Sequence, residues 1–400
     1  RALWGWNYGY CCRLFTLTLG ADDVIAGQLS KTRVIVIDEL RADATISELD
    51  VKYFWTNMYN LILNSNLMIE GISGSSGSFE EKKPYLGEAY FMRAFAYYNL
   101  VRIFGDVPAI IDSKSAQDVL GNENIGRNRV ADIYDKIIVP DLIMAEEYLP
   151  EVPRTRDNSS VGKIAAQTCL SEVYLTMAGW PLKRTEYYAK AAEKAKQIIE
   201  ASYNTHRLVE HYEDLWKEVM KSDNTEHIFA INCSRLNSMA SQYGISFLAM
   251  EENGWSDYLA DEAFYLKYPD DERKAFNYKT TYNRAGRPGQ TIIVPYTQST
   301  MKSPFINKYR DYGTDAAQSD GIIPIYRYAD VLLIYAEAQN LANNGPDDLA
   351  YRCINDVRKR ATGGTPNDIP ENLSGEDFDK YVFDERGWEF FAEFKRWFHL

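Results

Sequence analysis

Five stretches of this 400-residue chain repeat one spacing of apolar or small residues, with successive steps of four, three and four positions. Because an α-helix turns once in about 3.6 residues, such positions lie on one face of a helix and form a continuous stripe. The spacing therefore predicts a chain dominated by amphipathic helices. The stripes are Tyr90/Ala94/Tyr97/Val101, Ile138/Leu142/Ala145/Leu149, Ala166/Leu170/Val173/Met177, Tyr188/Ala192/Ala195/Ile199 and Val331/Tyr335/Ala338/Ala342.

Several stripe positions are alanine, which lets neighbouring helices approach closely. This combination is typical of stacked helix pairs, as in tetratricopeptide arrays. We also expect a helix in the second half of residues 1–20, a loop over 21–45 and a flexible connector at the Gly/Ser-rich stretch 71–78. Pro140 is expected to kink or restart the helix that contains it. The main helices are predicted at about 48–70, 84–104, 130–149, 160–178, 184–201, 328–343, 346–361 and 376–398.

Between residues 203 and 323 the helical stripes fade, and short β-branched or aromatic runs stand among Gly, Asn, Asp and Tyr. Two of these runs, 227–232 and 291–294, predict short strands. The predicted fold class is mostly α: a tetratricopeptide-like helix-pair scaffold with an irregular, loop-rich lobe carrying a few short strands. We expect a single domain over 1–400, with the scaffold at about 1–202 and 324–400 and the lobe inserted at about 203–323.

The formal net charge of −13 narrows the classes of partner. Phosphate backbones and anionic membrane surfaces both need basic side chains, so an acidic chain disfavours nucleic acid and lipid headgroups. A neutral ligand such as a sugar is compatible with this charge. No apolar run reaches the roughly 18 residues that a membrane-spanning helix needs. Because the chain begins at Arg1 without an initiator Met and ends on an aromatic-rich segment, we expect a longer protein.

The motifs of several enzyme classes are missing from the sequence. There is no Gly-rich phosphate-binding loop, no Gly-x-Ser-x-Gly, no His-Glu-x-x-His and no Cys-x-x-Cys. We therefore predict neither a metal site nor a cofactor. Adjacent carboxylates such as Asp22 and Asp23 cannot face one glycosidic bond, because neighbouring side chains point apart. Distant carboxylates can converge in a fold, so an all-α glycoside hydrolase stays open as an alternative.

Aromatic loop residues are the best functional lead in the sequence. The segment 243–258 places Tyr243, Trp255 and Tyr258 among Gly, Ser, Asn and acidic residues. Sugar rings stack their C–H faces on aromatic rings, while carboxylates and amides bind their hydroxyl groups. Asp23 lies in a loop where its charge has no helical use, so a polar ligand contact is plausible there too. The alternative is that these rings pack the insert against the helices.

The chain also resembles a known family, the SusD/RagB-like nutrient-binding lipoproteins of Bacteroidetes. Five blocks carry the resemblance, in the family's order and across nearly the whole chain. They are Trp55/Tyr59/Ile62/Asn66, 87–94 (GEAYFMRA) running to 104–108 (FGDVP), 162–166 (GKIAA) to 173–175 (VYL), 325–333 (IYRYADVLL) to 336–338 (AEA), and 384–387 (DERG) to 396–398 (RWF).

The resemblance implies a non-catalytic, surface-exposed lipoprotein of the outer membrane that captures oligosaccharides or polysaccharides. It implies a partner as well, a TonB-dependent transporter that contacts the helical-repeat face. The signal and lipid-anchor cysteine of the family lie outside this sequence, and Cys11-Cys12 has no lipobox before it. By relative position, segment 243–258 and the loop around Asp22-Asp23 fall where such members bind sugar.

The leading hypothesis is glycan binding without turnover. Sugar would stack on Trp255 with Tyr243 and Tyr258, while Asp23 and Asp257 would bind hydroxyl groups. Two alternatives remain at this point: the glycoside hydrolase, and a helical-repeat adaptor that binds only protein. In the scaffold, we expect Arg93 and Arg327 to pair with buried carboxylates such as Glu337 or Glu88.

Overall fold

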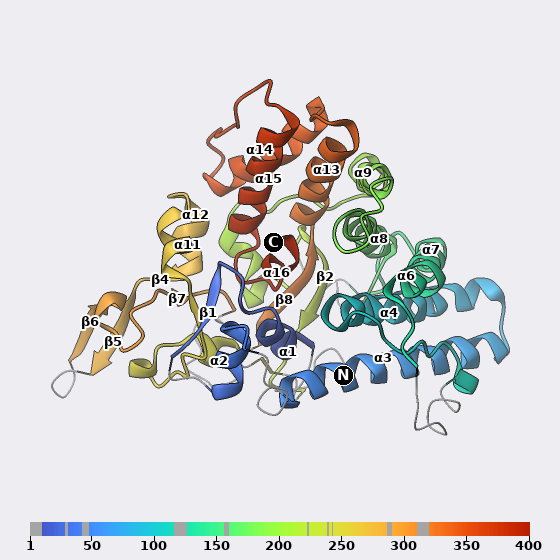
Figure 1. Ribbon diagram of the computed structural model, residues 1–400, viewed down its shortest axis with the longest axis horizontal. Coiled ribbons are helices and arrows are strands. Elements are labelled where there is room, and N and C mark those ends of the chain that lie inside the picture. The colour runs from blue at the N-terminus through green and yellow to red at the C-terminus, as the bar shows by residue number, and fades with distance from the viewer. Residues whose placement is uncertain are drawn as a thin grey trace.

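The computed structural model shows a mostly helical protein with short strands at the left and in the centre of Figure 1. It describes residues 10–28, 31–41, 48–115, 126–155, 160–221, 224–237, 240–241, 243–285, 290–309 and 320–400. The helices are α1 (Tyr10–Leu17), α2 (Thr32–Asp38), α3 (Glu48–Gly74), α4 (Phe79–Phe104), α6 (Val130–Ile133), α7 (Val139–Tyr148), α8 (Lys163–Ala178), α9 (Tyr187–Glu200), α10 (Tyr243–Phe247), α11 (Glu262–Lys267), α12 (Glu272–Asn277), α13 (Tyr328–Asn343), α14 (Asp348–Ala361), α15 (Gly375–Glu389) and α16 (Arg396–His399).

The long helices form an array in which successive members pack side by side. Helix α3 packs on α4, α4 on α7, α7 on α8 and α8 on α9. After a long excursion the chain returns as α13, which packs against α9 and begins the final group with α14 and α15 (Figure 1). Every position of the five predicted stripes is buried or half-buried, so the helix-pair scaffold predicted from the spacing is confirmed.

Helix boundaries differ from the prediction where local caps and prolines intervene. Helix α4 starts at Phe79, before Pro84, because Ser78 and Glu81 form a capping box. Helix α3 continues to Gly74, so its last turns take up part of the predicted connector. Before Pro140, residues Tyr134–Ile138 form a π-helical turn, which accommodates a residue that cannot donate the regular helical hydrogen bond.

Two further predictions about local structure were wrong. The region 21–45, predicted as loop, contains strand β1 (Val24–Ala26) and helix α2. The predicted last helix, 376–398, breaks after Glu389 and resumes as α16. Ala392 and Phe394 adopt left-handed backbone angles, with φ of 57° and 64°, which end a right-handed helix.

Short antiparallel strand pairs organise the segment between α9 and α13. The predicted strand 227–232 is β2 (His227–Asn232), which pairs with β8 (Ile322–Arg327). The predicted strand 291–294 lies within β6 (Thr291–Pro295), which pairs with β5 (Thr281–Ala285). The other pairs are β1 with β3 (Tyr258–Ala260), and β4 (Tyr278–Lys279) with β7 (Phe305–Ile306).

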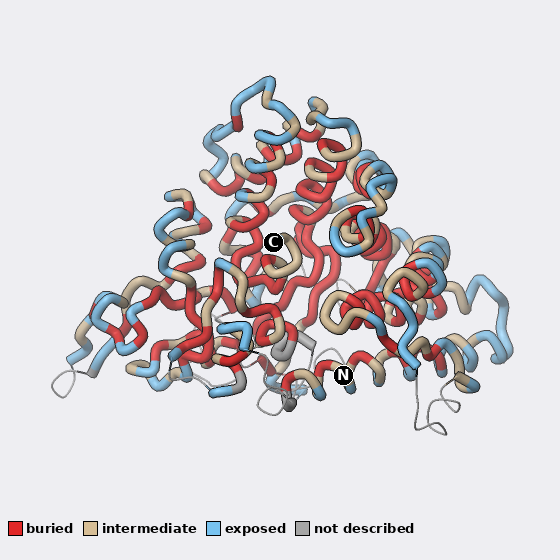
Figure 2. Tube along the Cα trace, viewed as in Figure 1, coloured by how far each residue is buried: buried red, intermediate tan, exposed pale blue. Residues whose placement is uncertain are grey.

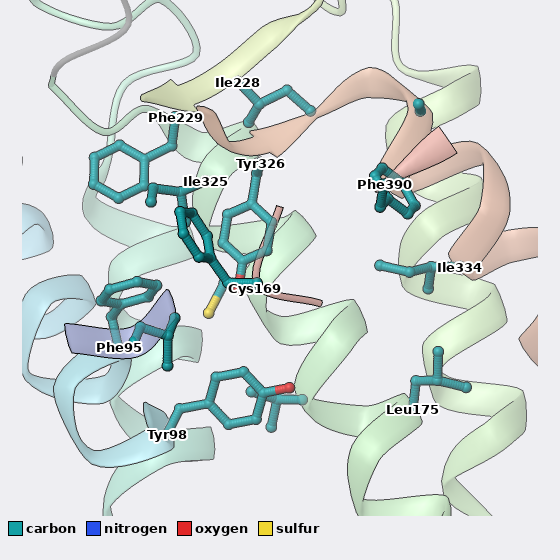
Figure 3. Close-up of a cluster of buried hydrophobic side chains, with 14 of the residues drawn as sticks. Phe95, Tyr98, Cys169, Leu175, Ile228, Phe229, Ile325, Tyr326, Ile334 and Phe390 are labelled. Atoms are coloured by element: carbon teal, nitrogen blue, oxygen red, sulfur yellow. The ribbon is translucent and has the colours of Figure 1, made fainter. Parts of the chain in front are cut away.

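One hydrophobic cluster extends from Leu14 to Phe394 and joins the helical array to the strand-bearing segment. Figure 2 shows this buried interior running through the middle of the molecule. In Figure 3, Phe229 and Tyr326 from β2 and β8 lie against Phe95 of α4 and Cys169 of α8. Among the described residues, no helix is both long and apolar enough to cross a membrane.

A buried network of ion pairs ties the C-terminal helices to the rest of the fold. Arg327, at the start of α13, is the centre of this network. Its guanidinium lies 2.6 Å from Glu226, 2.7 Å from Glu389 and 2.9 Å from Glu393. Such pairs persist inside a protein only when every charge is matched. The cations are Arg273, Lys308, Arg327, Arg358 and Arg360, and the carboxylates are Glu226, Asp271, Glu385, Glu389 and Glu393.

The expectation that Arg93 and Arg327 pair with buried carboxylates is confirmed, but the named partners were wrong. Arg93 of α4 binds Asp141 of α7 through two hydrogen bonds of 2.7 and 2.8 Å. The predicted partners bind other arginines: Glu88 pairs with Arg154 and Glu337 with Arg386. The correct partners come from elements distant in the sequence, which no local spacing identifies.

Candidate functional site

The fold brings together the two regions that the sequence singled out. Strand β1 follows Asp22-Asp23 directly. It pairs with β3, which begins at Tyr258, the last residue of segment 243–258. The register sets Val24 against Ala260 and Ala26 against Tyr258. Beyond this pair, the Gly27 N–H donates to the Asp257 carbonyl at 3.0 Å. The end of segment 243–258 is therefore fixed against the N-terminal part of the chain.

Segment 243–258 folds into a compact turn that holds Trp255 in place. The Trp255 N–H donates to the Ile245 carbonyl at 2.9 Å, and the Ser256 N–H donates to the Leu248 carbonyl at 3.1 Å. Gly254 allows this closure, because a Cβ at that position would lie 2.1 Å from the Leu248 oxygen. Backbone hydrogen bonds at Trp255 and at the residue after it therefore hold this part of the turn, and Trp255 is 38% exposed.

Tyr243 and Tyr258 lie below this surface, in a cluster of aromatic rings around Phe15 of α1. The centroid of the Phe15 ring is 5.7 Å from that of Tyr243 and 4.7 Å from that of Tyr258. The Tyr258 hydroxyl is 2.7 Å from the Thr16 hydroxyl. Both tyrosines are buried. The geometry gives them the packing role that the sequence left open as the alternative, and they anchor the base of the turn that carries Trp255.

A lysine from the N-terminal part of the chain, between β1 and α2, lies close to the Trp255 ring. Lys31, the residue at the N-cap position of α2, places its Nζ 2.9 Å from Oδ2 of Asp257 and over the Trp255 ring, 4.9 Å from the ring centroid. The Asp257 side chain is 7% exposed, whereas that of Lys31 is 46% exposed. The candidate site is therefore the exposed ring of Trp255 with an ammonium group over it, and a buried carboxylate holds that ammonium in position.

Asp23 lies at the other end of β1, against the C-terminal segment. Its carboxylate is buried and accepts a 3.2 Å hydrogen bond from the Ala392 N–H, while neighbouring Asp22 pairs with Arg396. Burial raises the pKa of Asp23 from 3.8 to about 6, against the opposing effects of the Ala392 N–H and Arg396. In this position Asp23 joins distant parts of the chain, and little of its carboxylate is open to a ligand.

The raised pKa of Asp23 predicts a pH-dependent stability. The folded chain holds the Asp23 proton more tightly than the unfolded chain, so this group lowers stability as pH rises from about 4 to about 6. The variant Asp23→Asn lacks the titrating group but keeps an oxygen for the Ala392 N–H. We expect its stability advantage over wild type to grow across that window, up to the order of 3 kcal/mol.

Urea unfolding of both proteins at several pH values between about 4 and 7 tests this expectation. A stability difference that stays constant with pH would show that Asp23 keeps its ordinary pKa.

Carboxylates do converge in the fold, but within the buried ion network. Burial alone would raise the pKa of Glu389, yet the guanidinium groups of Arg360, Arg327 and Arg273 outweigh it and hold that pKa below 4.5. A glycosidase needs one carboxyl with a raised pKa that reaches the scissile bond. This cluster suits folding rather than proton transfer. Among the described residues, no group of His, Cys, Asp and Glu side chains could hold a metal ion.

Comparison with known protein families shows to which family this chain belongs. The family described as "SusD family" matches residues 151–400, which is more than half of the chain. The chain belongs to the SusD family. A second description, "Starch-binding associating with outer membrane", matches residues 22–175. Together the two matches cover both the helical array and the strand-bearing segment.

Individual SusD-like proteins extend the similarity to most of the chain. SusD-like protein P2 of Formosa agariphila is 31% identical over an aligned length of 378 residues, and the match covers 88% of this chain and 71% of that protein. A SusD superfamily protein from Parabacteroides distasonis has a TM-score of 0.83 at 28% identity, over 96% of this chain and 80% of that one. A crystal structure with xylogluco-oligosaccharide has a TM-score of 0.77 at 22% identity, over 99% of this chain and 79% of that one. The mostly helical fold is that of SusD-superfamily structures.

In this SusD-family chain, Lys31 lies at the candidate site, and the sequence analysis did not single it out. It lies 226 positions before Asp257, in a region predicted as loop. The signal available in the sequence is the apolar run at 34–37, which argues against a loop there. In the structure, Val34 and Val36 are buried in α2.

Proposed function

We propose that this protein binds glycans at the cell surface without cleaving them and delivers them to a TonB-dependent outer-membrane transporter. The observation that carries the proposal is the exposed indole of Trp255 on a rigid turn beside Lys31 and Asp257. Membership of the SusD family supports it, as does the description of the family matched at 22–175. The similar fold that holds a xylogluco-oligosaccharide is consistent with it.

In this proposal, a sugar ring stacks on Trp255, and polar groups at the rim of the indole bind its hydroxyls. Tyr243 and Tyr258 contribute by anchoring the turn through the ring cluster around Phe15. Asp257 contributes by holding Lys31, and Asp23 by fixing β1. Because one indole face covers little of a ligand, we expect weak to moderate affinity, with chain length adding contacts.

A glycan-array screen of the purified protein, with product analysis of every hit, tests this function. We expect binding and unchanged oligosaccharides, and about a tenfold or greater loss of affinity in Trp255→Ala, as for truncation of a central aromatic anchor. The matched control is Trp180→Ala, because Trp180 is also exposed, at 76%, but follows the end of α8 in the helical array. Released products would contradict the non-catalytic role, and equal binding by Trp255→Ala would exclude this site.

The location and partner rest on the family relationship. We propose that the protein is held at the outer membrane by a lipid anchor upstream of this sequence and that its helical array contacts the transporter. Passing detergent-solubilised outer membranes over the immobilised protein tests this partner: retention of a TonB-dependent transporter is the expected result, and its absence from the retained fraction contradicts the proposal.

A further inference from the structure

We propose that Lys31 is a ligand-binding residue that selects neutral glycans, by donating hydrogen bonds to the hydroxyl groups of a sugar stacked on Trp255. This inference rests on the proposed glycan-binding function and adds to it a polar contact and a substrate class. It follows from three features of the structure: exposure, geometry and charge.

Exposure decides which polar group a ligand on Trp255 can reach. The carboxylate of Asp257, which the sequence suggested for this role, has a side chain only 7% exposed, and Asp23 is buried at the far end of β1. Lys31 has a side chain 46% exposed and lies next to the indole. Of these three described side chains, Lys31 is therefore the one that presents its functional group at the surface.

Geometry makes Lys31 a directed donor rather than a freely moving chain. An isolated surface lysine loses considerable side-chain entropy when it is fixed by a ligand. Here the 2.9 Å contact with Asp257 already restricts the ammonium, at 4.9 Å from the centroid of the Trp255 ring. An ammonium has three N–H donors, and the Asp257 contact uses one. A sugar that stacks on the open part of the indole brings its hydroxyl oxygens to this group.

Charge indicates that the sugar is neutral. Segment 243–258 contains Glu251, Glu252 and Asp257 and no basic residue. Lys31 is matched by Asp257, and Lys279 is matched by Glu252 at 2.8 Å. Glu251 accepts hydrogen bonds from the Thr300 N–H and hydroxyl, which leaves its negative charge in place. Among these five groups the carboxylates outnumber the ammonium groups by one, so a uronate or sulfate ester at Trp255 would find no unmatched cation among them, on a chain whose net charge is −13.

The test compares binding of two oligosaccharide panels by calorimetry. The neutral panel contains malto-, xylo-, manno- and xylogluco-oligosaccharides, and the anionic panel contains oligogalacturonides, alginate oligosaccharides and sulfated oligosaccharides. We expect wild type to bind a neutral member and to bind anionic members at least about tenfold more weakly. Lys31→Gln should weaken neutral binding by about tenfold or more, the size of one charge-assisted hydrogen bond. Lys31→Arg should keep most of the affinity.

The control for these variants is Lys183→Gln. Lys183 lies 4.4 Å from the centroid of the exposed Trp180 ring, so this pair reproduces the Lys31–Trp255 arrangement on another part of the surface. It should leave affinity unchanged. Gln at position 31 can still donate to Asp257, which protects the fold, and thermal unfolding checks this. If Lys31→Gln does not fold, two other results test the proposal: the affinity of Lys31→Arg for the neutral panel, and the ratio of the wild-type affinities for the neutral and anionic panels.

The outcomes separate this inference from the function on which it rests. Wild type that prefers the anionic panel, or neutral binding that Lys31→Gln leaves unchanged, overturns the role of Lys31 but keeps glycan binding. Wild type that binds neither panel overturns both.

Discussion

Arg327→Met is expected to destabilise the folded protein by about 3–5 kcal/mol, the range for breaking a buried ion pair by removing one partner. The guanidinium bonds Glu226, Glu389 and Glu393, and all four side chains are fully buried. Methionine fills much of the volume but leaves carboxylates facing one another without their shared cation. Those charges come from the residue before β2, the end of α15 and the segment after it, so the loss loosens the junction between the array and the strand-bearing segment.

Thermal and urea unfolding of Arg327→Met measure this loss, provided that the transition remains two-state. The matched control is Lys380→Met, because Lys380 pairs with Glu376 at the surface of α15, where both side chains are exposed. Exposed pairs are screened by water and salt, so the control should unfold like wild type. A variant Arg327→Met with wild-type stability would show that the network relaxes without its central cation.

Gly254→Ala is expected to abolish glycan binding and to destabilise the turn that presents Trp255. The added Cβ would lie 2.1 Å from the oxygen and 2.3 Å from the carbon of the Leu248 carbonyl, distances at which backbone must move. Moving it breaks the hydrogen bonds from Trp255 to Ile245 and from Ser256 to Leu248. The methyl group itself is small, so the effect measures how far binding depends on the shape of this turn.

Affinity for the best glycan-array hit, together with thermal unfolding, checks this expectation. Gly71→Ala is the control, since nothing lies within 4 Å of its added Cβ and it stands inside helix α3. That change should stabilise the helix by about 0.5–1 kcal/mol and leave binding unchanged. Wild-type affinity in Gly254→Ala would mean that the ligand does not use the Trp255 turn.

The helical scaffold could be predicted from the sequence more fully than the candidate site around Trp255. Repeated stripes such as Ala166/Leu170/Val173/Met177 identify helices because the period of a helix is local, and all four of these residues are buried in α8. Strand β2 was also predicted, from a run of β-branched and aromatic residues. Boundaries failed where a cap or a left-handed residue decided them, as at Ser78 and Phe394.

For the candidate site, the sequence indicated which segment to consider, but not which of its side chains are exposed or which residues lie beside them. Aromatic and acidic residues in 243–258 pointed to this segment, and the pairing of β1 with β3 brings it beside Asp22-Asp23. Composition does not distinguish a ring that faces solvent from one that packs inside. Tyr258 is buried because Phe15 and Thr16, about 240 positions earlier, cover it. Lys31 was overlooked because its partner Asp257 is equally remote.

By itself, the sequence determined the helical class, the acidic surface and the blocks shared with the SusD family, because each depends on residue identity or on spacing within a few turns. Tertiary structure alone decided which aromatic residue of segment 243–258 remains at the surface, which carboxylates pair with Arg327 and which cation lies near the Trp255 ring. Burial and charge pairing depend on neighbours brought together from hundreds of residues apart, and the packing of the whole chain selects those neighbours.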